Sequence, residues 1–359
     1  MNIIRLPGLI DIHVHLRTPG QTHKENFSTG TKAAIAGGFT TIFDMPNNKI
    51  PITTAARLER KIRTAKNKIY SDVGFYFGSL GDNLTEFERV ANKVYGLKLY
   101  LNETTGNFLI SKDRLTDIFK AWKKVTNKPV LVHAEEDAIE AVINISKRIK
   151  QQVHFCHISL ASDLKQIIRT KEAGVKITCG VTPHHLFLTQ DDAKKLGPYG
   201  RMKPFLKSAE DVKFLWKNIE YIDAVESDHA PHTKAEKDSD TPPYGVPGLE
   251  TTLPLLLTAV HAGKLEVSEI KRLCYSGPKK ILHLKHDTGK IEVDLDQEYV
   301  INNDELFTKC GWSPFAGPPG QSPLGGGRKV YGKVKKVTLR GKAVFENGKF
   351  RSMPQGKVI

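Results

Sequence analysis

The chain has 359 residues, of which 39% are hydrophobic, enough to bury one barrel domain or two ordinary domains. Its formal net charge is +15, but the basic residues are scattered, and the densest cluster, Lys333 to Lys336, contains no interleaved aromatic residue, so we expect no nucleic-acid partner. No apolar run has membrane-spanning length, and residues 1–7 are broken too early by Pro7 to form a signal sequence. We therefore expect a cytoplasmic protein without membrane contact.

Short apolar or β-branched runs recur along the chain and predict eight strands. These are Leu9–His15, Phe39–Asp44, Asp72–Phe77, Gly96–Leu101, Val130–His133, Val153–His157, Lys176–Val181 and Ile222–Ser227. Amphipathic stretches between them predict helices, among them Ala55–Ala65, Leu115–Lys124 and Asp137–Lys147. Eight strands alternating with helices indicate an α/β fold, the (β/α)8 TIM-type barrel. We expect residues 8–285 to form this barrel and residues 286–359 to form a small β-rich extension that packs with residues 1–7.

The pair His13 and His15 stands at the end of the first predicted strand. Because alternate side chains of a strand share a face, both imidazoles point the same way and can bind one metal ion. Two histidines at this spacing also occur by chance on many strands, so the pair alone does not separate a metal site from a structural role.

Further candidate ligands stand where the barrel prediction requires them, at the C-terminal ends of strands. Lys98 lies within the fourth predicted strand, His133 and His157 end the fifth and sixth, and Asp228 directly follows the eighth. Taken singly, each histidine is better explained as a hydrogen-bonded core residue and the lysine as the partner of a buried acid. Their joint placement with His13 and His15 favours a metal centre.

The number of candidate ligands exceeds what one metal ion needs. Imidazole nitrogens and a carboxylate suit zinc. Two ions held close together need a bridging ligand, and Lys98 can supply one if carbon dioxide converts its amine to a carbamate. A bare ammonium group beside two cations would be repelled.

Several longer motifs carry a resemblance to a known family. They are Pro7 to Arg17, Asp44-Met45-Pro46-Asn47, Gly96 to Thr104, Val132-His133-Ala134-Glu135, Cys156-His157, Pro183 to Phe187, Ser227 to His232, and Gly248-Leu249-Glu250-Thr251. On these motifs the chain resembles the dihydroorotases of the amidohydrolase superfamily, above all the dihydroorotase domain of the multifunctional pyrimidine-synthesis polypeptide of animals. The resemblance spans nearly the whole chain.

The resemblance implies a cofactor of two Zn²⁺ ions bridged by N6-carboxylated Lys98. It implies that one ion is held by His13, His15 and Asp228, and the other by His133 and His157. A third zinc site of the animal relatives uses a cysteine and a glutamate. Cys156 matches the first, but Gly180 stands at the second position, so we expect no third zinc.

The resemblance also implies which residues act on the substrate. Those expected to bind it are Arg17, Asn47, Lys203, His232 and Tyr244. Lys203 replaces an arginine of the animal relatives, so the charge is kept but not the bidentate geometry, which Arg201 would compensate. Thr104 lies in a loop that closes over the substrate in this family, and together with Asp228 it is the expected catalytic residue.

The implied reaction is reversible cyclisation of N-carbamoyl-L-aspartate to L-dihydroorotate, a step of de novo pyrimidine (UMP) biosynthesis. Zinc lowers the pKa of bound water from about 15.7 toward about 7, so a metal-bridging hydroxide is the expected nucleophile. Asp228 is the expected general acid and base, because it can pass a proton between the nucleophile and the ring nitrogen.

Two alternatives stay open at this point. A related cyclic amidase, such as a hydantoinase, dihydropyrimidinase or allantoinase, would act on a neutral ring, whereas Arg17 and Asn47 favour an anionic substrate. A non-catalytic barrel relative would be expected to lack some of the ligands, and here all six are present. The resemblance further implies a homodimer, and docking of another pathway enzyme stays open.

Overall fold

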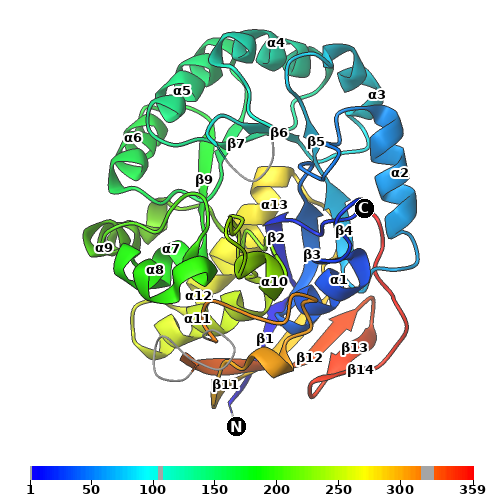
Figure 1. Ribbon diagram of the computed structural model, residues 1–359, viewed down its shortest axis with the longest axis vertical. Helices are drawn as coiled ribbons and strands as arrows, with labels where there is room; N and C mark the ends of the chain where they lie inside the picture. Colours follow the sequence, from blue (N-terminus) through cyan, green and yellow to red (C-terminus); the bar gives the residue numbers. More distant parts are fainter. Residues whose placement is uncertain (1, 104–107, 317–326) are drawn as a thin grey trace.

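The computed structural model describes residues 2–103, 108–316 and 327–359 and has the α/β architecture of a (β/α)8 barrel (Figure 1). The barrel strands are β2 (Leu9–Val14), β3 (Phe39–Asp44), β4 (Asp72–Phe75), β5 (Phe77–Gly78), β6 (Leu97–Tyr100), β7 (Val130–His133), β8 (Val153–Phe155), β9 (Ile177–Val181) and β10 (Ala224–Val225). They pair in parallel in the orders β2-β3-β4 and β5-β6-β7-β8-β9-β10. The third predicted strand is interrupted at Tyr76, which separates β4 from β5.

The helices connect the strands and cover the barrel from outside (Figure 1). They are α1 (Phe27–Ala36), α2 (Ala55–Ala65), α3 (Phe87–Val90), α4 (Leu115–Val125), α5 (Asp137–Ile149), α6 (Ala161–Glu172), α7 (Pro183–Phe187), α8 (Gln190–Leu196), α9 (Ala209–Lys217), α10 (Lys234–Lys237), α11 (Leu249–His261), α12 (Val267–Lys271) and α13 (Gly277–Leu282). Of the described residues, no helix is long and apolar enough to cross a membrane.

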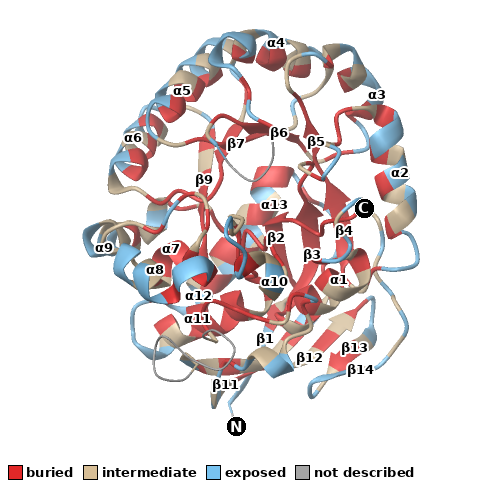
Figure 2. Ribbon diagram, in the orientation of Figure 1, coloured by how far each residue is buried: buried red, intermediate tan, exposed pale blue. Residues whose placement is uncertain are grey.

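Burial follows the amphipathic pattern of the sequence. Figure 2 shows buried residues on the barrel strands and exposed residues on the outer faces of α2 to α6. In α4 the buried residues are Leu115, Ile118, Phe119 and Trp122, the helical spacing that places one face against the strands. The four cysteines are all free and buried.

The first strand of the chain and strands from its C-terminal part meet in a second, antiparallel sheet below the barrel in Figure 1, whereas the last residues, Val358 among them, pair with β4. Its order is β1 (Ile3–Pro7), β11 (Lys290–Val300), β12 (Lys329–Leu339), β13 (Lys342–Glu346) and β14 (Lys349–Phe350). An ion pair attaches this sheet to the barrel, because Arg340 Nη1 lies 3.1 and 2.9 Å from the two carboxylate oxygens of Asp72.

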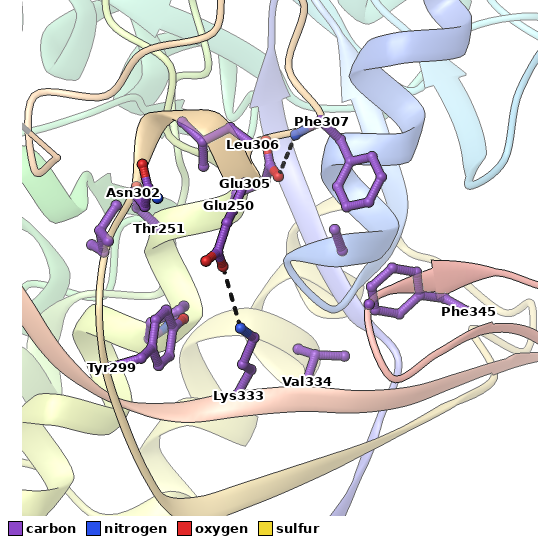
Figure 3. A pocket seen from close by; sticks show the side chains of 14 residues that line it. Glu250, Thr251, Tyr299, Asn302, Glu305, Leu306, Phe307, Lys333, Val334 and Phe345 are labelled. Atoms are coloured by element: carbon purple, nitrogen blue, oxygen red, sulfur yellow. Dashed lines mark hydrogen bonds and ion pairs between the residues drawn. The ribbon is translucent and has the colours of Figure 1, made fainter. Parts of the chain in front are cut away.

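A cavity of about 310 Å³ lies between α11 and this sheet (Figure 3). Its wall is mainly apolar, and Tyr299, Val334 and Phe345 contribute to it. Lys333 and Glu305 form an ion pair of 3.4 Å within its lining. The Glu250 carboxylate accepts a hydrogen bond from the backbone N–H of Phe307 at 2.8 Å, so it fastens the 307 loop to α11.

The barrel closes between its first and last strands through a few specific contacts. Val14 and His229 form a β-bridge, and the backbone N–H of His15 donates to the carbonyl of His229 at 2.8 Å. The buried carboxylate of Asp11 accepts from the backbone N–H of Ser227 at 3.1 Å and from that of His13 at 3.0 Å. These bonds set the two strand ends side by side.

A buried ion pair fixes the loop after β3. Lys61 Nζ lies 2.8 Å from Asp44 Oδ2, and both side chains are at most 1% exposed. Lys61 also donates to the carbonyl of Met45 at 2.7 Å and to Asn48 Oδ1 at 3.0 Å. The loop that carries Asn47 therefore depends on one buried ammonium group.

Removing this ammonium group would leave the Asp44 carboxylate unpaired in the interior. We expect Lys61→Met to lower the free energy of unfolding by about 3–5 kcal/mol, the usual effect of breaking a buried pair from one side. Urea denaturation measures it, with the exposed Lys66→Met as control. A loss no larger than that of the control would show that the pair does not stabilise the loop.

Candidate active site

Six side chains converge at the C-terminal end of the barrel. They are His13 within β2, His15 just after β2, Lys98 from β6, His133 from β7, His157 after β8, and Asp228 after β10. All six are buried. The structure thus brings together every metal ligand that the sequence predicted.

The first cluster is built around one carboxylate. Asp228 Oδ1 lies 3.0 Å from His15 Nε2 and 3.4 Å from His13 Nε2. Ligand atoms of the three residues all lie within 4.8 Å of one another, so they could hold one metal ion. Burial lowers the pKa of His15 to about 4, which keeps its imidazole neutral, the form that binds a metal.

The second cluster is a pair of histidines whose nitrogens face each other. His133 Nδ1 lies 3.0 Å from His157 Nε2. Burial lowers the pKa of His133 to about 3 and that of His157 well below its ordinary value. Two neutral imidazoles with converging nitrogens are suited to share a metal ion.

Lys98 lies fully buried near both clusters. Its Nζ lies 3.0 Å from the Cys156 thiol and 4.9 Å from the centroid of the Tyr100 ring. Among the described residues no carboxylate forms an ion pair with it, so the expected alternative of a lysine paired with a buried acid is wrong. A buried cation without an acid partner is costly, and conversion to a carbamate would remove that cost.

Backbone strain accompanies three of the site residues. Arg17, His157 and Asp228 have φ values of 58°, 39° and 44°, in the left-handed region that side chains other than glycine rarely adopt. Strain of this kind costs about 1–3 kcal/mol per residue and persists where the surrounding structure holds a functional side chain in place.

Glu226 contacts the first cluster, although no sequence motif pointed to it. The Glu226 carboxylate is 3.6 Å from His13 Nδ1 and 3.5 Å from His154 Nε2, and it accepts from the backbone N–H of His157. Burial raises its pKa, but hydrogen bonds and charges of His13 and His154 outweigh this effect and hold it below its ordinary value. His13, Cys156 and Glu226 form a second group that could hold a metal ion.

Glu226 lies where Gly180 leaves room for a carboxylate. We expected no third zinc because Gly180 stands where the animal relatives have a glutamate, and that expectation stays a prediction. A Cβ on Gly180 would lie 2.6 Å from Glu226 Oε1, so the glycine leaves room for a carboxylate that comes from the neighbouring strand end. The available signal was an acid directly before Ser227 in a buried strand.

The predicted substrate residues lie beside the ligands. Arg17 Nη2 and His232 Nε2 are 3.1 Å apart, and Arg17 Nε donates to the Pro231 carbonyl at 3.1 Å. His232 Nε2 lies 2.9 Å from the Tyr244 carbonyl. Asn47 Oδ1 instead lies 2.7 Å from His15 Nδ1, so in this structure Asn47 orients a ligand imidazole.

Lys203 reaches the same region from the loop after α8. Its Nζ lies 3.4 Å from Glu103 and 5.0 Å from the centroid of the Tyr244 ring. Arg201 stacks on that ring as well, at 4.6 Å. The ring of Tyr244 thus contacts both basic side chains, while its carbonyl contacts His232. Thr104 lies outside the described residues.

A further histidine, His184, faces the first cluster. It is buried, and its Nε2 has no hydrogen-bond partner among the described residues. Its neighbour His185 bonds to Thr182 Oγ1 at 2.7 Å and to the Pro204 carbonyl at 3.0 Å, a structural role. Burial lowers the pKa of His184 to about 4.

Comparison with known sequences is consistent with this site. A profile described as the amidohydrolase family matches residues 4–296. The multifunctional protein CAD of Squalus acanthias is 41% identical over 351 residues, covering 96% of this chain and 15% of that protein. The dihydroorotase of Pyrococcus abyssi is 36% identical over 377 residues, covering 99% of this chain and 87% of that protein. The chain thus spans 15% of the length of the CAD protein but most of the archaeal relative.

Solved structures share the fold. The L-hydantoinase (dihydropyrimidinase) of Arthrobacter aurescens superposes with a TM-score of 0.91 at 24% identity, over 99% of this chain and 88% of that one. The inactive dihydroorotase-like domain of the Chaetomium thermophilum CAD-like multifunctional protein superposes with a TM-score of 0.83 at 26% identity, over the full length of both. At 24% identity the hydantoinase likeness concerns the fold alone.

The buried neutral histidines make the metal-free protein sensitive to acid. Between pH 6.5 and about 4, His184 binds a proton in the unfolded chain but not in the folded one, so the free energy of unfolding falls as the pH falls. A shift of this size corresponds to about 3 kcal/mol. We expect His184→Gln to flatten the pH dependence of urea denaturation across this window. An equally steep dependence in the variant would contradict the assigned pKa.

Proposed function

The chain belongs to the amidohydrolase family, and we propose that it is a dihydroorotase, a hydrolase of cyclic amides that interconverts N-carbamoyl-L-aspartate and L-dihydroorotate in pyrimidine biosynthesis. One observation carries the proposal: the buried His13, His15 and Asp228 cluster lies in the same barrel mouth as Arg17 and His232, which suit a carboxylate. Relatives named dihydroorotase, 36% identical over nearly the whole chain, support it.

The proposed cofactor is a pair of zinc ions. We assign one to His13, His15 and Asp228 and the other to His133 and His157, with N6-carboxylated Lys98 as the bridge. The residues fit such a pair, because the imidazoles are neutral, their nitrogens converge, and Lys98 lacks an acid partner among the described residues. When bound, zinc would polarise the amide carbonyl and make hydroxide available from water near neutral pH.

The substrate is an anion, and the chain offers cations where its carboxylate would lie. The Arg17 guanidinium is held by the Pro231 carbonyl through Nε, so Nη2 stays beside His232 Nε2 as a donor. Lys203 adds a further positive charge, and its ammonium group lies over the ring of Tyr244. Thr104 is proposed to act in the loop that excludes water.

Asp228 is the proposed proton carrier. The nearby imidazole of His13 and the hydrogen bond with His15 outweigh burial and hold the pKa of Asp228 below its ordinary value, so it is a carboxylate at neutral pH and can act as a base. In hydrolysis it accepts a proton from the attacking water and delivers it to the leaving ring nitrogen. In the reverse direction it takes a proton from the ureido nitrogen as the ring closes.

The alternative of a neutral cyclic amide has weaker support. The hydantoinase structures share the fold at about the same TM-scores as the CAD-like domain, so fold does not decide between substrates. A hydantoin or dihydropyrimidine ring would offer the buried Arg17 and the nearby Lys203 no carboxylate to pair with. We therefore favour the substrate that carries a carboxylate.

We extend the proposal to organisation and partners. Residues 8–285 form the catalytic barrel, and residues 286–359 form the extension that pairs with residues 1–7 through β1 and β11. A homodimer, a cytoplasmic location and contact with another pathway enzyme are proposed by analogy with the relatives, among them a multifunctional protein. We propose no nucleic-acid or membrane partner.

Asp228→Asn tests the proton carrier because it keeps the shape of the side chain and removes its basicity. We expect kcat for L-dihydroorotate hydrolysis, followed by loss of ultraviolet absorbance, to fall by about 10²–10⁴-fold. Asp240→Asn, an exposed acid, is the matched control and is expected to keep the wild-type rate. Full activity in Asp228→Asn would exclude the assigned role.

Arg17→Gln tests the charge of the substrate. Losing one charge-assisted hydrogen bond raises KM for L-dihydroorotate by about 10–100-fold, and we expect little change with the neutral ring dihydrouracil. A wild-type protein that hydrolyses hydantoin or dihydrouracil but not dihydroorotate would instead support the cyclic amidase. No hydrolysis of any of these rings by zinc-loaded protein would support a non-catalytic barrel.

A further inference from the structure

A buried lysine lies directly behind His232. Lys24 is only 7% exposed, although it belongs to a loop. Its Nζ lies 3.1 Å from His232 Nδ1 and 2.9 Å from Glu236 Oε1. No motif points to this contact, because Lys24 and His232 are 208 residues apart.

The contacts of His232 determine where its ring carries the proton. An ammonium group has only donors, so Lys24 requires a lone pair on Nδ1. The proton of the neutral ring is then on Nε2, where it can be donated to the Tyr244 carbonyl at 2.9 Å. In the opposite tautomer Nε2 could accept from Arg17. The Nδ1–H would then point at the ammonium of Lys24, and the Nε2 lone pair would point at the carbonyl oxygen of Tyr244.

This tautomer has a consequence for Arg17. Because Nε2 carries a proton, Arg17 Nη2 at 3.1 Å cannot donate into it. The two N–H groups therefore stand side by side, and Arg17 Nε is already bound to the Pro231 carbonyl. Two adjacent donors of which one is cationic form a site for a carboxylate.

We propose that Lys24 is a positioning residue that selects the Nε2–H tautomer of His232. The substrate carboxylate then replaces the Tyr244 carbonyl as acceptor of this N–H, and His232 and Arg17 act as a joint donor pair for it. The identity of the substrate rests on the proposed function. The tautomer itself does not, since it follows from contacts within the protein.

The Nδ1–H tautomer of His232 also has a nearby acceptor, the carboxylate of Glu236. Glu236 Oε2 lies 3.9 Å from His232 Nδ1 and is otherwise bonded to the backbone and hydroxyl of Thr233. Without Lys24, an Nδ1–H group would donate toward Glu236, and the lone pair on Nε2 would accept from Arg17. That arrangement uses one Nη2 N–H of Arg17 and turns a lone pair of His232 toward the substrate carboxylate.

The first test is Lys24→Leu, with Lys285→Leu as control for the loss of one exposed cation. The ¹⁵N shifts of His232, assigned by comparison with His232→Gln, report the tautomer directly. We expect the proton on Nε2 in the wild type and on Nδ1 in Lys24→Leu. We expect KM for L-dihydroorotate to rise at least about tenfold, the effect of one lost charge-assisted hydrogen bond, with kcat nearly unchanged.

The second variant is Lys24→Leu combined with Glu236→Gln. In glutamine the oxygen can stay at the Oε2 position and cap Thr233, while the NH2 takes the Oε1 position, which lies 2.9 Å from the Lys24 ammonium in the wild type. From there it can donate toward Nδ1 in place of Lys24, so we expect the Nε2–H tautomer and most of the affinity to return. A merely structural role for Lys24 would not be rescued by this change. Equal zinc content and circular dichroism spectra show that the variants are folded.

Several results would overturn the proposal. A wild-type His232 with its proton on Nδ1 does so without any variant, and so does an unchanged tautomer or an unchanged KM in Lys24→Leu. If the wild type does not hydrolyse dihydroorotate, the proposed function fails, while the ¹⁵N measurement still decides the role of Lys24.

Discussion

The candidate site depends on how the barrel closes between β2 and β10. Only a few contacts among the described residues join these two strands. Val14 and His229 form a β-bridge, and the Asp11 carboxylate accepts hydrogen bonds from the backbone at both strand ends. Because this closure fixes the strand ends, the carboxylate of Asp228 faces His13 and His15 from across the seam. Asp11 is fully buried, and burial raises its pKa to about 7.

The positive charge of the chain is partly concentrated around one mouth of the barrel. Arg17, Lys24, Arg201, Lys203 and Lys237 lie within one network of contacts that passes through His232 and Tyr244. Burial lowers the pKa of Lys237 to about 7, with the charges of Arg201 and Arg17 adding to the effect. Cations gathered at this end of the barrel attract anionic substrates.

The sequence predicted the part of the site that follows from strand periodicity. His13, Lys98, His133 and their partners stand at strand ends, and in a barrel those ends meet at one face, so strand periodicity alone implied their proximity. The family and the barrel were confirmed by the relatives and the solved structures. The roles assigned to individual residues stay predictions until they are measured.

Contacts between loops could not be predicted in this way. Lys24 meets His232 and Asn47 turns toward His15, and neither contact has a local pattern. The strand at 72–77 was predicted as continuous, but Tyr76 interrupts it and donates through its hydroxyl to the Ile12 carbonyl at 2.9 Å. Such features depend on side-chain geometry across the barrel rather than on hydrophobic periodicity.

The most direct test of the account is anomalous X-ray diffraction at the zinc edge from crystals of the zinc-loaded protein. The account predicts two neighbouring peaks, one among His13, His15 and Asp228 and one between His133 and His157, with density for a carbamate on Lys98 between them. A single peak, or an unmodified Lys98 with zinc bound elsewhere, would contradict the binuclear centre on which the proposed reaction depends.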